Sequence, residues 1–206
     1  MILKSNLQIV KKLIDYGANM ETQDQNGRSP LRLALLQRND KIIKVLLIYG
    51  VKVSKGTFMM LALNGNPEIV KIMLDLWANI EHFGCLIIVA ALGKLEVLKL
   101  LIKYGADVNE STYCTPLHKA VEYNKGEIVS ELLKNGANPN LQDTNGNTPI
   151  HEASRQPEAM KLLLDEGINL NLEIRNQLGD TAFECNLRKA CKDAAKIMLH
   201  FNHQNR

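Results

Sequence analysis

The sequence has 206 residues, of which 46% are hydrophobic and 23% charged, as is usual for globular proteins. The 25 lysine and arginine residues nearly balance 22 acidic ones, and a net charge of +3 does not predict a nucleic-acid-binding protein. No apolar run approaches the roughly 20 residues that span a bilayer, which excludes a membrane-spanning class.

Cellular location is suggested by the cysteines and by the first residues. Four cysteines, Cys85, Cys114, Cys185 and Cys191, show no disulfide-framework spacing, which favours a reducing compartment. The chain starts directly on helical sequence, so we expect no signal peptide. The sequence therefore predicts a cytoplasmic protein.

Residues 1–23 predict one helix and the tail of a repeat. The string Val10-Lys-Lys-Leu-Ile-Asp-Tyr-Gly-Ala18 places a glycine directly after a helical apolar pattern, where glycine supplies a left-handed C-terminal residue. Similar strings end at Gly50, Gly105 and Gly136. We interpret residues 1–23 as a half-repeat or N-terminal cap.

Residues 24–53 form the first whole predicted repeat. Asp24-Gln-Asn-Gly27 has the composition of a tight turn. The string Ser29-Pro-Leu-Arg-Leu-Ala34 predicts a helix, as a weaker copy of two later strings in which proline suits the first helical turn. A second helix then ends at Gly50.

Two shortened repeats, residues 54–80 and 81–109, follow. Only six or seven residues connect each to the repeat before it, against 10 or 12 in the later repeats. Their turn signals are absent, and their first helices become apolar. The corresponding strings are Gly56-Thr-Phe-Met-Met-Leu-Ala62 and Gly84-Cys-Leu-Ile-Ile-Val-Ala90.

The most regular repeats are residues 110–142 and 143–175. Their first helices begin with Thr115-Pro-Leu-His-Lys-Ala120 and Thr148-Pro-Ile-His-Glu-Ala153, which lie 33 residues apart. In the second of them the connection between helices is two residues shorter, so Pro157 is expected to open the second helix. Residues 176–206 predict a C-terminal repeat with the polar end that terminal repeats need.

These strings closely resemble the ankyrin repeat, whose period is about 33 residues and whose signature is T-P-L-H-x-A. The resemblance covers nearly the whole chain. It implies a single all-α domain, residues 1–206, built as an ankyrin-repeat solenoid of helix-turn-helix units with short or trimmed β-hairpin fingers. It also implies that the motif histidines tie neighbouring turns together instead of acting as bases or ligands. The structural motif residues are Thr115, Pro116, His118, Thr148, Pro149 and His151.

The resemblance further implies where a partner binds. Members of the family normally contact it with finger tips and with the exposed end of each first helix. The matching positions are Gln25, Asn26, Arg28, Leu63, Asn64, Ala91, Leu92, Tyr113, Glu122, Tyr123, Asn145, Asn147, Arg155, Gln156 and Arg188. Each could also be an ordinary solvated residue. Tyr113 and Tyr123 stand out, because exposed aromatic residues recur in interface hot spots.

The shortened repeats depart from the family pattern. Met59 and Ile87 stand where the family keeps its histidine, and Trp77, the only tryptophan, replaces a terminal glycine. We hypothesise that Met60, Trp77 and Leu92 mark a shallow apolar stretch of the partner-binding surface between polar fingers. The alternative is that such apolar residues simply pack between repeats.

No catalytic or cofactor motif is present. The sequence lacks a glycine-rich phosphate loop, an H-E-x-x-H motif and a G-x-S-x-G motif. Cys185, Cys191, His200 and His203 match no zinc-finger spacing. We therefore expect no enzyme activity, no cofactor, no metal and no small-molecule substrate.

The sequence predicts a non-catalytic, monomeric adaptor that binds another protein, with no nucleic acid and no membrane as partner. Twenty asparagines and the trimmed repeats resemble viral or intracellular-bacterial host-interaction proteins, which suggests an effector in a host cytoplasm or nucleus. The alternative is a structural or regulatory segment of a larger multidomain protein.

Overall fold

The computed structural model describes residues 7–76, 85–165, 169–188 and 192–204. Within these ranges every regular element is a helix and no strand occurs, which confirms the predicted all-α architecture. The chain divides into two compact units, residues 1–81 and 82–206, which we call unit 1 and unit 2.

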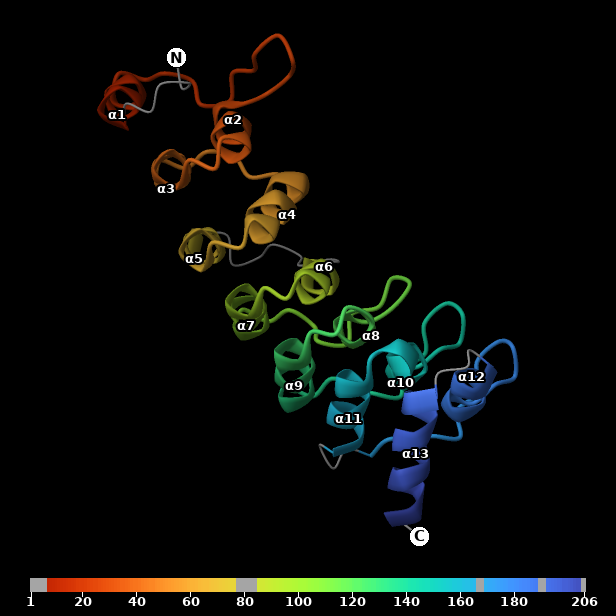
Figure 1. The fold of residues 1–206 in the computed structure, drawn as a ribbon. Coiled ribbons are helices and arrows are strands. Elements are labelled where there is room, and N and C mark those ends of the chain that lie inside the picture. The colour runs from red at the N-terminus through yellow and green to blue at the C-terminus, as the bar shows by residue number, and fades with distance from the viewer. Residues whose placement is uncertain (1–6, 77–84, 166–168, 189–191, 205–206) are drawn as a thin grey trace. The chain divides into compact units, whose positions relative to one another are not determined.

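Unit 1 is built from helix pairs. Its helices are α1 (Leu7–Asp15), α2 (Pro30–Leu36), α3 (Asp40–Ile48), α4 (Lys55–Asn64) and α5 (Pro67–Leu76). Helix α3 packs between α1 and α5, whereas α2 packs against α4 (Figure 1). The second helices of successive repeats thus form one layer, and the first helices form another.

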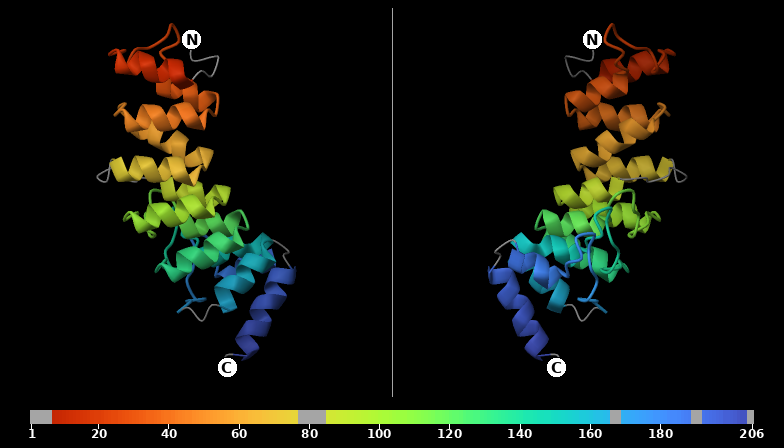
Figure 2. Two further views of the ribbon diagram at one scale, coloured as in Figure 1. Left: turned by 90° about the vertical axis from the view of Figure 1, so that its left-hand side faces the viewer. Right: turned by 90° about the vertical axis from the view of Figure 1, so that its right-hand side faces the viewer.

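Unit 2 repeats this two-layer arrangement (Figures 1 and 2). Its helices are α6 (Cys85–Leu92), α7 (Leu95–Lys103), α8 (Pro116–Glu122), α9 (Gly126–Lys134), α10 (Pro149–Glu152), the 3-10 helix η2 (Ala153–Arg155), α11 (Pro157–Asp165), α12 (Ala182–Arg188) and α13 (Lys192–Gln204). Helices α6, α8, α10 and α12 contact one another in order, and so do α7, α9, α11 and α13. As expected, Pro157 opens α11, and η2 makes the short connection before it.

Local sequence explains where the helices begin and end. Ser29 accepts a hydrogen bond from the Arg32 amide and caps α2. The glycines that follow second helices have positive φ, 82° at Gly50 and 92° at Gly105, which is the predicted left-handed ending. The first helices α2 and α8 end similarly, but on the non-glycine residues Arg38 (φ 50°) and Asn124 (φ 51°).

The fingers are hydrogen-bonded turns. Both predicted turns form: the Gly27 amide donates to the Asp24 carbonyl over 2.9 Å, and the Gly146 amide donates to the Asp143 carbonyl over 3.0 Å. In each turn the aspartate Oδ1 also accepts two backbone amides. Asn176 supplies the same acceptor in a third turn.

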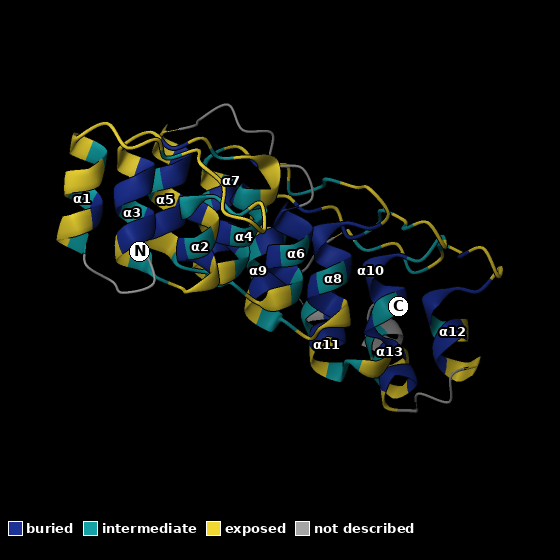
Figure 3. Cartoon of the chain, turned by 90° about the horizontal axis from the view of Figure 1, so that it is seen from above, coloured by how far each residue is buried: buried dark blue, intermediate teal, exposed yellow. Residues whose placement is uncertain are grey.

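The core lies between the two layers of helices, as the dark blue faces in Figure 3 show. The leucines four residues before Gly50, Gly105 and Gly136 lie in the core of their own unit: Leu46 is 1% exposed, and Leu101 and Leu132 are 0% exposed. In the first shortened repeat Ser54 caps α4, which begins at Lys55, so the connection to it is indeed brief. Residues 77–84, which include Trp77, lie outside the described residues.

Candidate functional site

The Thr-Pro-x-His motifs form a buried frame that links neighbouring repeats in unit 2. The Thr115 amide donates to Nδ1 of His118 over 3.2 Å, so Nε2 carries the ring hydrogen and donates to the carbonyl of Asn147, 2.9 Å away. His151 repeats the geometry, with 3.2 Å to the Thr148 amide and 3.2 Å to the Asp180 carbonyl. Pro116 and Pro149 occupy the first helical turns beside them.

Burial lowers the pKa of His118, and its hydrogen bond to Asn147 opposes this change only in part. A proton added at Nδ1 would also face the Thr115 amide, which already donates to that atom. The folded chain therefore holds His118 in its neutral form.

The free energy of unfolding should fall as the pH drops from 7.5 to 5.5. An unfolded histidine takes up a proton with a pKa of about 6.5, whereas the folded His118 resists protonation. The unfolded chain then binds more protons, so acidification favours it. Urea titrations at several pH values should show a shallower dependence for His118→Gln than for the natural chain. Equal slopes would contradict this assignment, since both chains share every other histidine.

A cluster of four side chains, which we call the tyrosine patch, lies on and beside α8, next to the buried Thr115 and His118. It comprises Tyr113 on the finger before α8, Lys119 and Glu122 on α8, and Tyr123 directly after it. Tyr113 and Tyr123 are 50% and 52% exposed. The Lys119 ammonium lies 5.8 Å from the Tyr113 ring centre and 6.0 Å from that of Tyr123, which is cation–π range.

Lys119 is held in place by charge as well as by the rings. Its Nζ lies 2.6 Å from a carboxylate oxygen of Glu122, and this hydrogen bond raises the pKa of Lys119 above its ordinary value. The lysine is thus a cation at neutral pH, with its side chain only 23% exposed. The patch presents two aromatic faces around a fixed positive charge.

Equivalent positions of the neighbouring repeats flank the patch. Leu92, at the end of α6, is the counterpart of Tyr123 and is 49% exposed. Gln156 is the counterpart in the next repeat, and its Nε2 donates to the Glu122 carbonyl over 3.2 Å. Ala91 is half-buried, and Arg155 is exposed. Since α8 contacts both α6 and α10, these predicted residues lie in adjoining repeats of one unit.

Other predicted residues of unit 2 are engaged within the chain. The Asn147 side chain donates to the Glu152 carboxylate over 2.9 Å and accepts from the Asn176 side chain over 3.0 Å. It therefore links two neighbouring fingers. The carbonyl of the exposed Asn145 accepts the Gln177 amide over 3.0 Å. Arg188 forms a 2.5 Å ion pair with the buried Asp180.

The predicted residues of unit 1 are spread over a finger and a helix. Gln25 and Asn26 are exposed at the tip of the first finger, where Arg28 forms a 2.7 Å ion pair with Asp24. On α4, Met60 and Leu63 are half-buried, and Asn64 is exposed.

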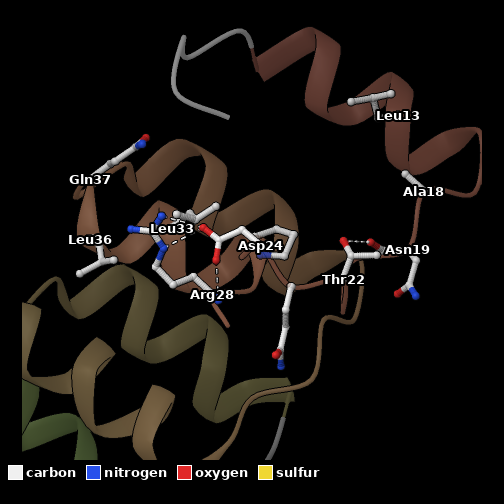
Figure 4. A pocket seen from close by; sticks show the side chains of 11 residues that line it. Leu13, Ala18, Asn19, Thr22, Asp24, Arg28, Leu33, Leu36 and Gln37 are labelled. Carbon is white, nitrogen blue, oxygen red and sulfur yellow. Dashed lines mark hydrogen bonds and ion pairs between the residues drawn. The ribbon is translucent and has the colours of Figure 1, made fainter. Parts of the chain in front are cut away.

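The sequence did not predict two features of these sites. Lys119 was not expected to join the tyrosines, although its place between them on a short helix could have suggested it. The second is a groove of about 660 Å³ beside α1 and α2 in unit 1 (Figure 4). Its sequence signal was the predicted half-repeat, residues 1–23, whose pattern predicts the second helix of a repeat.

Metal-ligand clusters are absent from residues 7–76, 85–165, 169–188 and 192–204. In those ranges no three histidine, cysteine, aspartate or glutamate side chains gather as they would around a metal ion. Cys191, one of the four residues weighed for zinc, lies outside them. No described helix combines the length and the apolar character needed to cross a bilayer.

Comparison with known proteins agrees with the repeat pattern. A family profile described as "Ankyrin repeats (3 copies)" matches residues 1–83, 58–143 and 124–206. The chain is 31% identical over 157 residues to the nuclear factor NF-kappa-B p105 subunit of Gallus gallus, covering 74% of the chain and 14% of that protein. It is 28% identical over 166 residues to the mitochondrial disaggregase of Bos taurus, covering 77% and 21%.

A bacterial relative has a similar length. The chain is 26% identical over 185 residues to the putative ankyrin repeat protein YahD of Escherichia coli strain K12, which covers 80% of the chain and 92% of that protein. In contrast, the chain spans only about a seventh and a fifth of the chicken and bovine relatives.

Proposed function

Because the chain belongs to the ankyrin-repeat family, whose repeats generally serve protein–protein interaction, we propose that it is a non-catalytic binding protein that engages a partner protein through the tyrosine patch. The observation that carries this proposal is the pair of half-exposed tyrosines held around the Lys119 ammonium. Leu92, Arg155 and Gln156 extend the contact surface along neighbouring repeats.

Physical reasons favour this surface. Tyrosine gives a large contact area at a small cost in side-chain entropy, and it is enriched among residues that dominate binding energy. The patch stands on Thr115 and His118, which are 1% and 2% exposed and fully engaged in hydrogen bonds. A partner would therefore meet a preorganised surface, and little ordering would oppose binding.

Substituting both tyrosines should abolish most of the affinity for the partner. We expect Tyr113→Ala with Tyr123→Ala to weaken binding at least tenfold, which is about 1.4 kcal/mol or more. Tyr16→Ala is the matched control, since Tyr16 is 89% exposed in unit 1 and is not part of the patch. Proteins captured from a eukaryotic lysate by the natural chain would be purified, and their dissociation constants measured for each variant.

The control outcomes are clear-cut. The double variant should keep the natural circular dichroism spectrum, because both side chains are half-exposed. A partner that binds the double variant and the natural chain equally would overturn the assignment of the site. Loss of binding in Tyr16→Ala as well would move the site to unit 1.

Two finer roles remain as proposals. A regulatory segment of a larger protein is supported by the length of the chicken and bovine relatives. An effector role is supported by the asparagine-rich composition and the trimmed repeats, and it requires the partner to come from a host. The complete gene distinguishes the first role, and the origin of the captured partner distinguishes the second. The free thiols of Cys114 and Cys185 support a reducing compartment such as the cytoplasm.

A further inference from the structure

The chain itself shows which chemistry fits beside the two tyrosine rings of the patch. The Lys119 ammonium lies 5.8 Å from the ring centre of Tyr113 and 6.0 Å from that of Tyr123. The same ammonium donates a 2.6 Å hydrogen bond to a carboxylate oxygen of Glu122. Two aromatic faces and a carboxylate therefore converge on one point, and this combination of groups attracts a cation.

The surroundings of Lys119 carry more negative than positive charge. Burial raises the pKa of the Cys114 thiol, and the nearby Lys119 ammonium lowers it. The carboxylates of Asp143, Glu122 and Glu152 raise it further. Among these charges, which act most strongly on the thiol, three are anions and one is a cation. A second cation brought to this surface would therefore be attracted to it.

Lys119 can leave its place at little cost. Its side chain is 23% exposed and that of Glu122 is 41% exposed, so water reaches both charged ends when they separate. Ion pairs of this kind contribute little to stability, because water solvates each group once the pair opens. The finger keeps its own support, since the Tyr113 carbonyl accepts the Thr144 amide over 3.0 Å. The rings and the carboxylate thus form a site that the free chain fills with its own lysine.

We propose that the tyrosine patch binds a basic segment of the partner protein, and that an arginine of this segment replaces Lys119 between Tyr113 and Tyr123. This inference rests on the proposed function and names the chemistry of the partner. Arginine suits the position better than lysine, because its planar guanidinium stacks on aromatic rings and donates two parallel hydrogen bonds to one carboxylate. Glu122 would accept these bonds.

The neighbouring repeats define what lies on either side of the arginine. Helix α8 contacts both α6 and α10 (Figure 1). Leu92, at the end of α6, is 49% exposed and offers an apolar contact. On the other side Arg155 is exposed, and the Gln156 side chain is held by the Glu122 carbonyl. We therefore expect the partner to place an apolar side chain on Leu92 and no second basic residue near Arg155.

The experiment uses a synthetic peptide with one arginine as the probe. Neighbouring helices lie roughly 8–10 Å apart, which is about three residues of extended chain. The peptide Leu-Gly-Ser-Arg-Ser-Gly-Leu therefore presents a leucine to Leu92 in either chain direction. It is titrated into the isotope-labelled full chain and followed by the amide NMR signals of Tyr113, Lys119 and Tyr123. We expect saturable shifts, and a matched peptide with neutral citrulline in place of arginine should bind about tenfold more weakly or less.

Substitutions in the chain test the roles of the rings and of the two charges. Lys119→Ala should tighten binding of the arginine peptide about threefold or more, because it vacates the place beside the rings. A variant that tightens binding cannot owe its effect to misfolding. Glu122→Gln should weaken binding about tenfold, whereas Glu127→Gln, which changes an exposed carboxylate on α9, is the matched control. Tyr113→Phe with Tyr123→Phe should retain binding, because both aromatic faces remain.

Four outcomes would overturn the inference. They are the absence of saturable shifts, equal binding of the arginine and citrulline peptides, weaker binding after Lys119→Ala, and preference for a peptide with glutamate in place of arginine. The last two would make Lys119 the binding group and the partner acidic.

Failure of the proposed function has a different signature. It fails when a purified partner binds Tyr113→Ala with Tyr123→Ala as tightly as it binds the natural chain. If the partner instead requires both tyrosines but binds Lys119→Ala more weakly, the tyrosine patch is the binding site and an arginine is not its ligand.

Discussion

Replacing Leu46 with alanine should lower the free energy of unfolding by about 2–5 kcal/mol, the usual loss for a fully buried leucine. Leu46 is 1% exposed on α3, which packs against α1, α2 and α5. Truncation removes methyl groups from water-free surroundings and leaves a cavity that three neighbouring helices can close only partly. Urea denaturation followed by circular dichroism would measure the change.

Leu13 provides the matched control for Leu46, since it holds the same position one repeat earlier. Because it is 42% exposed, Leu13→Ala should cost about 1 kcal/mol or less. If Leu13→Ala and Leu46→Ala cost the same in the free chain, the groove would already be filled.

Much of the fold follows from short-range signals in the sequence. Ser29 with Pro30 sets the start of α2, and Gly50 sets the end of α3, because capping and left-handed conformations depend on few neighbours. The aspartate turns at Asp24 and Asp143 are equally local. The spacing of these signals predicted the order of helices and turns in both units.

Features without a residue-type signal were harder to predict. Arg38 and Asn124 adopt positive φ, which costs a non-glycine residue energy, and backbone hydrogen bonds from the Asn39 amide to Ala34 and from the Lys125 amide to Ala120 close these helix ends. In the shortened repeats glycines occupy these positions, Gly65 (φ 73°) and Gly93 (φ 68°). The residue after the first helix therefore has positive φ in complete and in shortened repeats, although its residue type differs.

The two candidate surfaces also combine features that the sequence predicts with features that it does not. Exposure of Tyr113 and Tyr123 followed from their repeat positions, but the arrangement of Lys119 between the rings depends on side-chain geometry. The groove could not be read from Leu13 itself, because the string around it matches the strings around buried leucines. Whether such a leucine is buried depends on helices elsewhere in the structure, so the sequence of α1 alone does not predict it.

Replacing Gly146 with alanine should cost about 3 kcal/mol or more, because two penalties combine. Gly146 has φ 74°, a conformation that costs residues with a side chain about 1–2 kcal/mol. In addition, a Cβ at this position would lie 2.8 Å from the backbone nitrogen of Gln177 and 3.1 Å from Cα of Asn176. These are backbone atoms of the next finger, so the fingers would have to separate.

Separation of the fingers would also break bonds between repeats. The Gln177 amide donates to the Asn145 carbonyl over 3.0 Å, and the Gln177 side chain donates to the Thr144 carbonyl over 2.8 Å. Gly179 is the matched control: it holds the same turn position 33 residues later, has φ 79°, and a Cβ there would meet no atom within 4 Å. Gly179→Ala should therefore cost only the conformational penalty of about 1–2 kcal/mol. Equal losses in the two variants, measured by urea denaturation, would mean that contact between fingers adds nothing to the stability of unit 2.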